Sequence, residues 1–123
     1  MRKGDVIKVK TNAELLNKLF GTNYNGWQKS VYDCEGIRVW MIYLDHKERN
    51  KWRNYKDGNL IVEENMAPVE EQYGLRSDTR SFVYRAVFSK HAGYFVFEGV
   101  YEYDKTKSSP QRLRYYTLVR EEF

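Results

Sequence analysis

Three runs decide the fold of this chain: SFVYRAVF at residues 81–88, YFVFEGVYEY at residues 94–103 and LRYYTLVR at residues 113–120. In each run β-branched and aromatic residues alternate with polar ones, and short polar links separate the runs. This pattern is typical of strands that follow one another in an antiparallel sheet. We therefore expect the last third of the chain to form a three-stranded meander.

The alternation also predicts which rings of the meander share a face, because successive side chains of a strand point to opposite sides of the sheet. The rings expected to lie together are Phe82, Tyr84 and Phe88 on one strand, and Phe95, Phe97, Tyr101 and Tyr103 on the next. Most of these rings are predicted to fill the core, since each buries a large apolar area.

A short helix is predicted near the N-terminal end of the sequence, after a strand at residues 5–10. Thr11 and Glu14 have the spacing of a capping box, in which each residue satisfies a backbone N–H at the start of a helix. Leucine and phenylalanine side chains then recur at helical spacing, and Gly21 suits the position just after the last turn. We expect the helix at residues 12–20.

Two further strands are expected between this helix and the meander. Residues 37–44 are apolar on both faces apart from Arg38, which is typical of a central strand. Residues 59–64 form a second candidate, which follows the turn signal Asp57-Gly58. The polar segments 22–30 and 45–58 are interpreted as loops, and residues 65–80 as a long surface connection.

These elements predict an α+β, mainly β fold with one short helix and about six strands. A small mixed, partly closed β-barrel satisfies the pattern, because closure hides the edges of a sheet. A length of 123 residues favours a single domain that spans residues 1–123.

The composition favours a globular protein with a negatively charged partner. Hydrophobic residues make up 41% and charged residues 31% of the chain, and the net charge is +4. The partner expected from this charge is a nucleic acid, with DNA favoured over RNA, or an acidic protein. A lone cysteine, Cys34, agrees with a reducing compartment, and no run approaches the ~20 apolar residues of a membrane span. We expect a cytoplasmic protein without membrane contact, and its oligomeric state is open.

The first candidate binding segment is the loop that contains Asn23, Tyr24 and Trp27. A tryptophan in such a loop suits stacking on a flat ligand, while asparagine side chains suit its hydrogen-bonding edge. The alternative interpretation is that Tyr24 and Trp27 close one end of the core.

The second candidate segment places two rings, Trp52 and Tyr55, among basic residues. Rings interleaved with cations are typical of surfaces that bind nucleic-acid bases and backbone. The alternative is a solvated loop whose tryptophan folds back onto the sheet. The basic residues expected to bind phosphates are Lys47, Arg49, Arg53 and Lys56.

Catalytic signatures are weak in this sequence. Asp45, His46 and Glu48 suggest a small metal-dependent nuclease, but neither His46 nor His91 has a partner at a diagnostic ligand spacing. We therefore expect no catalytic residue, no bound metal and no cofactor.

Several of these residues also carry a family resemblance. An Asn23-Tyr24 pair, followed after Gly36 by a strand that ends in the aromatic run WMIY at residues 40–43, resembles a motif of EVE domains. The run FEGVYE at residues 97–102 is similar to strands of reader domains attached to modification-dependent restriction enzymes. The chain thus resembles the PUA-like group, which includes EVE and SRA (YDG) domains. That resemblance implies a concave aromatic pocket for a flipped, modified base.

The leading hypothesis is a non-catalytic reader domain that binds nucleic acid, in the setting of bacterial or phage defence. Asn23 and Asp45 are expected to read the base edge, and Tyr24 to help line the pocket. The ring set of this hypothesis is Trp27, Trp40, Trp52 and Tyr55. The alternative is a small protein-binding module, such as a phage- or mobile-element-encoded inhibitor of a host defence enzyme.

Overall fold

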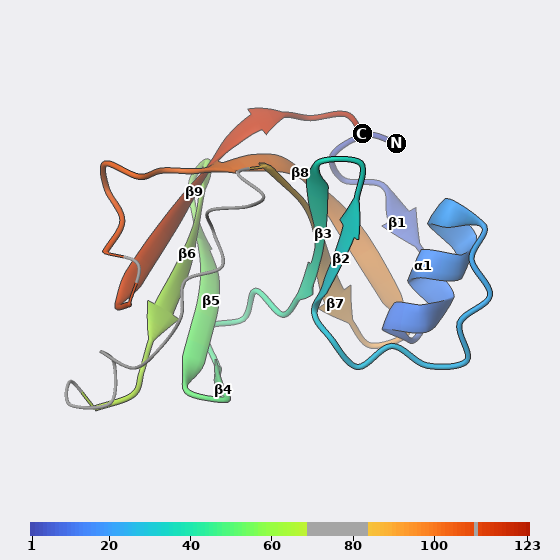
Figure 1. Cartoon of the computed structure of the whole chain (residues 1–123), viewed down its shortest axis with the longest axis horizontal. Coiled ribbons are helices and arrows are strands. Elements are labelled where there is room, and N and C mark those ends of the chain that lie inside the picture. Colours follow the sequence, from blue (N-terminus) through green and yellow to red (C-terminus); the bar gives the residue numbers. More distant parts are fainter. Residues whose placement is uncertain (69–83, 110) are drawn as a thin grey trace.

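The computed structural model describes residues 1–68, 84–109 and 111–123. Within these residues one sheet of nine strands runs in the order β2-β3-β7-β8-β9-β6-β5-β4, and β1 pairs with β8 beside this path. Figure 1 shows α1 and β1 on one side of the molecule, and β4, β5 and β6 in the opposite half of the sheet. The fold is therefore mainly β, as the sequence predicts. The elements are β1 (Val6–Ile7), α1 (Asn12–Phe20), β2 (Val31–Cys34), β3 (Ile37–Ile42), β4 (Glu48–Arg49), β5 (Trp52–Asp57), β6 (Leu60–Asn65), β7 (Tyr84–His91), β8 (Tyr94–Tyr103) and β9 (Leu113–Arg120).

The antiparallel meander is confirmed. Strand β8 pairs with β7 on one side and with β9 on the other, both antiparallel. The observed bounds of β8 and β9 coincide with the predicted runs, while residues 81–83 and 110 lie outside the described part of the chain.

The N-terminal helix is also confirmed, and its ends explain why it begins and stops where it does. Thr11 Oγ1 accepts a hydrogen bond from Glu14 N at 3.1 Å, and Gly21 has a φ of 65° in the left-handed region. The Glu14 carboxylate accepts from the backbone N–H of Lys10 at 3.2 Å, one residue before the cap. The side chains of Leu15 and Leu16 are fully buried against the sheet.

Three strands were not predicted. Residues 45–58 are not a loop: they contain β4 and β5, and β2 lies in a stretch to which no element was assigned. The polar composition of β5 made it resemble a loop, but its cation Arg53 matches an acid on β6 across the ladder. Arg53 stands opposite Glu64, with which it forms an ion pair.

Strand β3 is a buried internal strand, as predicted. It lies between β2 and β7 and pairs with β7 in parallel. Its odd-numbered residues Val39 and Met41 face a core under α1, and its even-numbered Trp40 and Ile42 face a second core on the other side. We call these the helix-side core and the inner core.

A β-bulge corrects the predicted distribution of rings in β8. Val87 pairs with Gly99 but Phe88 pairs with Phe97, so Glu98 is an extra residue. Gly99 has a φ of 116°, and a Cβ there would lie 2.5 Å from Leu118 Cδ1, which explains the glycine. The bulge reverses the parity of the strand: Phe95 and Phe97 lie in the helix-side core, whereas Tyr101 and Tyr103 lie in the inner core.

The sheet does not close into a barrel, so the partly closed barrel has only loose support. Strands β2 and β4 remain as the two ends of the strand order in the described residues. The sheet nevertheless curls. The rings of Trp40 on β3 and Tyr116 on β9 lie 4.9 Å apart, although β7 and β8 separate their strands. Across the ranges that the structure describes, no helix is long and apolar enough to span a membrane.

Candidate nucleic-acid interface

The connection from β3 to β5 gathers rings and charged groups at the surface. Strand β3 ends at Ile42, and the chain then turns through the short strand β4 before it enters β5. Tyr43 at the start of this segment is 39% exposed, unlike the buried residues of β3. We define the ring–cation cluster as two groups that adjoin along the chain at Asp45 and His46: the first is Tyr43, Asp45 and Arg49, and the second is His46, Arg53 and Tyr55.

A cation covers the first ring of this cluster. The Arg49 guanidinium lies 4.0 Å from the centroid of the Tyr43 ring. Both of its terminal nitrogens donate to the Asp45 carboxylate at 2.7 Å, and Lys47 N donates to Asp45 Oδ1 at 3.2 Å. These hydrogen bonds, chiefly those from Arg49, hold the pKa of Asp45 well below its usual range. Asp45 is therefore an ionised acceptor at neutral pH.

An imidazole covers the second ring. The His46 ring stacks on Tyr55 with 4.6 Å between centroids and 15° between planes. The Arg53 guanidinium lies 5.4 Å from the same tyrosine ring and also pairs with Glu64. Burial and the Glu64 carboxylate raise the pKa of Tyr55, so its phenol stays neutral. His46 is exposed and Tyr55 half-buried.

The backbone of this segment adopts a conformation that most residues avoid. His46, Asn50 and Lys51 have φ angles of 64°, 50° and 68°, all in the left-handed region. Each such non-glycine residue costs of order 1–3 kcal/mol in strain, and such residues concentrate at functional sites. The strained backbone therefore supports this segment as a candidate functional site.

The other predicted residues of β5 lie on the opposite side of that strand, because they differ in parity from Arg53 and Tyr55. Trp52 lies under Arg114, whose guanidinium is 4.5 Å from the ring. Lys56 Nζ donates to Glu98 Oε1 at 2.9 Å and so bridges β5 and β8. Neither residue belongs to the ring–cation cluster.

The loop with Asn23 connects α1 to the edge strand β2, whereas the cluster follows the neighbouring strand β3. Tyr24 and Trp27 pack against the helix-side core, 4.8 Å apart, and Trp27 Nε1 donates to Val31 O at 3.1 Å. This arrangement supports the interpretation that the two rings close one end of the core. Asn23 is exposed beside them.

Trp40 is a core residue in this structure. It is 2% exposed, and the guanidinium of the buried Arg85 lies 4.5 Å from its ring. The three predicted tryptophans, Trp27, Trp40 and Trp52, thus do not line one common cleft.

Sequence reasoning missed Tyr43 as a candidate site residue and assigned His46 only to the nuclease hypothesis. The available signal for Tyr43 was its position, since it continues the buried parity of Val39 and Met41 into a polar segment. For His46, no local sequence pattern predicts that its ring stacks on that of Tyr55, nine positions later in the chain. Both residues lie in the segment that the sequence had already singled out.

The nuclease hypothesis gains nothing from the geometry. Asp45 forms an ion pair with Arg49, and the ring of His46 stacks on that of Tyr55. In the described part of the chain no group of three or more His, Cys, Asp or Glu side chains is placed to hold a metal ion.

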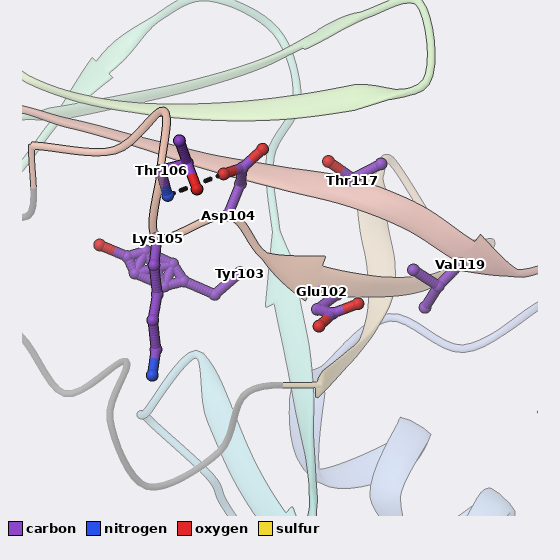
Figure 2. A pocket seen from close by; sticks show the side chains of 7 residues that line it. All are labelled: Glu102, Tyr103, Asp104, Lys105, Thr106, Thr117 and Val119. Carbon is purple, nitrogen blue, oxygen red and sulfur yellow. Dashed lines mark hydrogen bonds between the residues drawn. The ribbon is translucent and has the colours of Figure 1, made fainter.

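A separate pocket of about 610 Å³ lies at the turn that follows β8. Figure 2 shows its side chains around that turn and on the facing part of β9. Within the turn, Thr106 N donates to Asp104 Oδ1 at 2.9 Å. None of the predicted site residues lines it. The residues that line it are Glu102, Tyr103, Asp104, Lys105, Thr106, Thr117 and Val119.

Comparison with known proteins identifies the family. The model of the SRA family, the SET and RING associated domain, matches residues 1–123. This chain is an SRA domain. SRA domains bind DNA and read modified cytosines, which supports a nucleic-acid partner and confirms the resemblance to the PUA-like group.

A solved structure supports the fold of this SRA domain. It is similar to the 5-hydroxymethylcytosine-specific restriction enzyme AbaSI with a TM-score of 0.74 and 21% sequence identity. The match covers 98% of this chain and 40% of that chain, so the SRA domain spans less than half the length of AbaSI. At this identity the likeness concerns the fold alone. A search of the curated proteins finds no match.

Proposed function

We propose that this SRA domain reads a modified cytosine in DNA and takes the flipped base into the ring–cation cluster. The observation that carries the proposal is that Tyr43 and Tyr55 are covered by a guanidinium and an imidazole rather than by core side chains. Planar polar groups of this kind can give way to a nucleobase, which offers a similar flat face.

The energetics suit a flipped base. Extrusion of a base costs a few kcal/mol. Stacking on one aromatic ring contributes roughly 1–3 kcal/mol, which offsets much of that cost. Asp45 supplies an ionised acceptor for the exocyclic amino group of cytosine, because each carboxylate oxygen has a further lone pair beside its hydrogen bond to Arg49. His46 supplies a ring nitrogen beside it.

Exposed cations of the same segment are proposed to hold the flanking phosphates. Lys47, Arg49 and Arg53 lie on the exposed turn and on the outward side of β5, near the two tyrosines. Binding is then expected to weaken steeply with salt. Lys56 contributes less, because it points to the opposite side of β5 from Arg53 and Tyr55, where it pairs with Glu98.

The SRA domain is proposed to read without cutting. AbaSI is a restriction enzyme, but the match covers only 40% of its chain. Incubation of this domain with duplex DNA and divalent cations should leave the duplex intact, and specific cleavage by the purified domain would refute this part of the proposal.

The direct test is fluorescence anisotropy with three duplexes that differ only at one cytosine: unmodified, 5-methylated or 5-hydroxymethylated. We expect tighter binding to a modified duplex, and Tyr55→Ala should weaken it about tenfold. Tyr84→Ala is the matched control, since Tyr84 is 45% exposed on β7 and lies outside the cluster. Equal binding to all three duplexes would refute the proposal.

The alternative, a protein-binding module or inhibitor of a host defence enzyme, makes a different prediction. Affinity capture from a lysate should then yield one stoichiometric protein partner whose recovery is unchanged by nuclease treatment. Recovery that nuclease treatment abolishes supports the reader.

A further inference from the structure

A single row of paired residues crosses the sheet from the ring–cation cluster to the connection between β8 and β9. Arg49 on β4 pairs with Trp52 on β5, and Trp52 pairs with Asn65 on β6. Asn65 N donates to Arg112 O at 2.7 Å, just before β9 begins. Figure 1 shows the start of β9 beside the end of β6. Arg49 and Arg112 thus mark the two ends of one row, although they are far apart in the sequence.

Both arginines lie on the same face of the sheet. Residues paired across a ladder share a face, so Arg49 lies on the side of Trp52. The Arg114 guanidinium lies 4.5 Å from the Trp52 ring, which places Arg114 on that side of β9. The hydrogen bond from Asn65 to Arg112 continues the ladder by one residue, so Arg112 keeps the parity of Arg114. The row therefore has a cation at each end on one surface.

The cations of the β8–β9 connection have no acidic partners in the described part of the chain. Arg114 is buried and pairs with Glu63. By contrast, Arg112 is exposed, as are Lys105 and Lys107. Among residues 1–68, 84–109 and 111–123, no carboxylate forms an ion pair with any of these three. Three such cations close together in the sequence favour an anionic partner.

Hydrogen bonds hold the backbone of this connection in place. Asp104 Oδ1 accepts from Lys107 N at 3.0 Å, and Asp104 O accepts from Ser108 N at 3.1 Å. At the other end, the buried Asn65 side chain donates to Gln111 O at 2.7 Å. A backbone that is already ordered loses little conformational entropy when a partner binds. The connection is thus well suited to present its cations to a ligand.

The distance between the two arginines suits the DNA backbone. Neighbouring strands lie ~4.8 Å apart, so the three steps from β4 to β9 separate the backbones of Arg49 and Arg112 by about 14 Å. A DNA duplex rises ~3.4 Å per base pair, so this separation spans about four base pairs. Each guanidinium can bind one phosphate through two parallel hydrogen bonds. The pair therefore fits two phosphates of a duplex rather than one small anion.

We propose that the connection from β8 to β9 is a second contact with the DNA backbone. In this contact Arg112 binds a phosphate about four base pairs from the one bound by Arg49, and Lys105 and Lys107 add positive charge beside it. The inference rests on the proposed function, since it takes Arg49 as a phosphate contact next to the flipped base. It assigns to the connection a role in affinity and orientation rather than in recognition of the modification.

The first test measures the salt dependence of binding to the modified and unmodified duplexes described above. Arg112→Gln should lower the slope of log affinity against log salt by about 1, and a variant that combines it with Lys105→Gln and Lys107→Gln should lower it by up to about 3. The affinity ratio between the duplexes should not change. Lys18→Gln is the matched control, because it removes one exposed charge from α1. Circular dichroism confirms folding of each variant.

The second test locates the contact along the DNA. Duplexes are shortened one base pair at a time, on one side of the modified cytosine and then on the other. For the unaltered protein, affinity should fall when one flank becomes shorter than about four base pairs. Arg112→Gln should lose less affinity on the same truncation, because its contact beyond that point is already gone. An equal loss for both proteins on either side would contradict the proposed position.

The outcomes separate the inference from the proposed function. If the combined variant has the same salt slope as Lys18→Gln, the connection is not a DNA contact, while the proposed function stands if the affinity ratio exceeds one. If the combined variant brings the ratio to one, the connection recognises the modification and the inference is wrong as stated. If the unaltered protein shows no ratio, the proposed function fails, and a lower slope of Arg112→Gln on unmodified DNA still supports the contact.

Discussion

Two segments of this chain look alike in sequence and differ in structure. Residues 22–30 and residues 43–55 both place large rings among polar side chains. In the first, Tyr24 and Trp27 rest on the helix-side core. In the second, Tyr43 and Tyr55 are covered by Arg49 and His46. The difference lies in the neighbours of each ring, because apolar neighbours make a ring structural, whereas polar planar neighbours leave its face available to a ligand.

The largest expected effect concerns the first segment. Trp27→Ala should lower the free energy of unfolding by about 3 kcal/mol, because it removes a large half-buried ring and its hydrogen bond to Val31. Chemical denaturation measures this change. At a temperature where the variant is folded, its ratio of affinities for modified and unmodified duplexes should equal that of the unaltered protein. A stable Trp27→Ala protein that no longer discriminates would reverse the assignment of the two segments.

The second effect concerns the cation on Tyr43. Arg49→Gln should weaken DNA binding about tenfold and lower the salt slope by about 1, since it removes one charge-assisted contact and frees the Asp45 carboxylate. The free energy of unfolding should change by less than about 1 kcal/mol, because both partners of this ion pair are well exposed. Titration by anisotropy at several salt concentrations gives both quantities. A large loss of stability with unchanged binding would make Arg49 a structural residue.

The smallest effect extends the comparison to a ring that is wholly buried. Within the described residues, the hydroxyl of Tyr101 has no hydrogen-bond partner, and burial raises the pKa of this phenol to about 12. Tyr101→Phe should therefore be neutral or stabilise the fold by up to about 1 kcal/mol. Thermal unfolding measures it, and a marked loss of stability would mean that the hydroxyl has a partner.

The same phenol predicts a dependence on alkaline pH. The unfolded phenol ionises near pH 10, but the folded one does so only near 12, so its contribution to stability is complete below pH 10 and disappears between pH 10 and about 12. Tyr101→Phe should lose less stability over this window than the unaltered protein. Identical alkaline unfolding curves would contradict the assignment.

Local patterns predicted the helix and the meander well, because capping, helical spacing and alternation act over a few residues. They failed where distant pairing decides the structure. The match of Arg53 to Glu64 makes β5 a strand in spite of its polarity, and the bulge at Glu98 moves Tyr101 and Tyr103 away from Phe95 and Phe97.

The candidate site was predicted in part for the same reason. The sequence singled out Asp45, Arg49, Arg53 and Tyr55, and the structure pairs Asp45 with Arg49 and Arg53 with Tyr55. It did not predict that Lys56 reaches Glu98 on a strand three places away in the sheet, or that Lys90 on β7 lies beside Tyr43. Both contacts depend on the curvature of the sheet and on the register of its strands, which the local sequence does not predict.

The most direct test of the account is the affinity ratio between modified and unmodified duplexes, measured in parallel for Tyr55→Ala and Trp27→Phe. Phenylalanine keeps a ring in the core position, so the second variant isolates any role of Trp27 in recognition. We predict that Tyr55→Ala brings the ratio close to one and that Trp27→Phe leaves it unchanged. A ratio that survives Tyr55→Ala and collapses in Trp27→Phe would contradict the central claim.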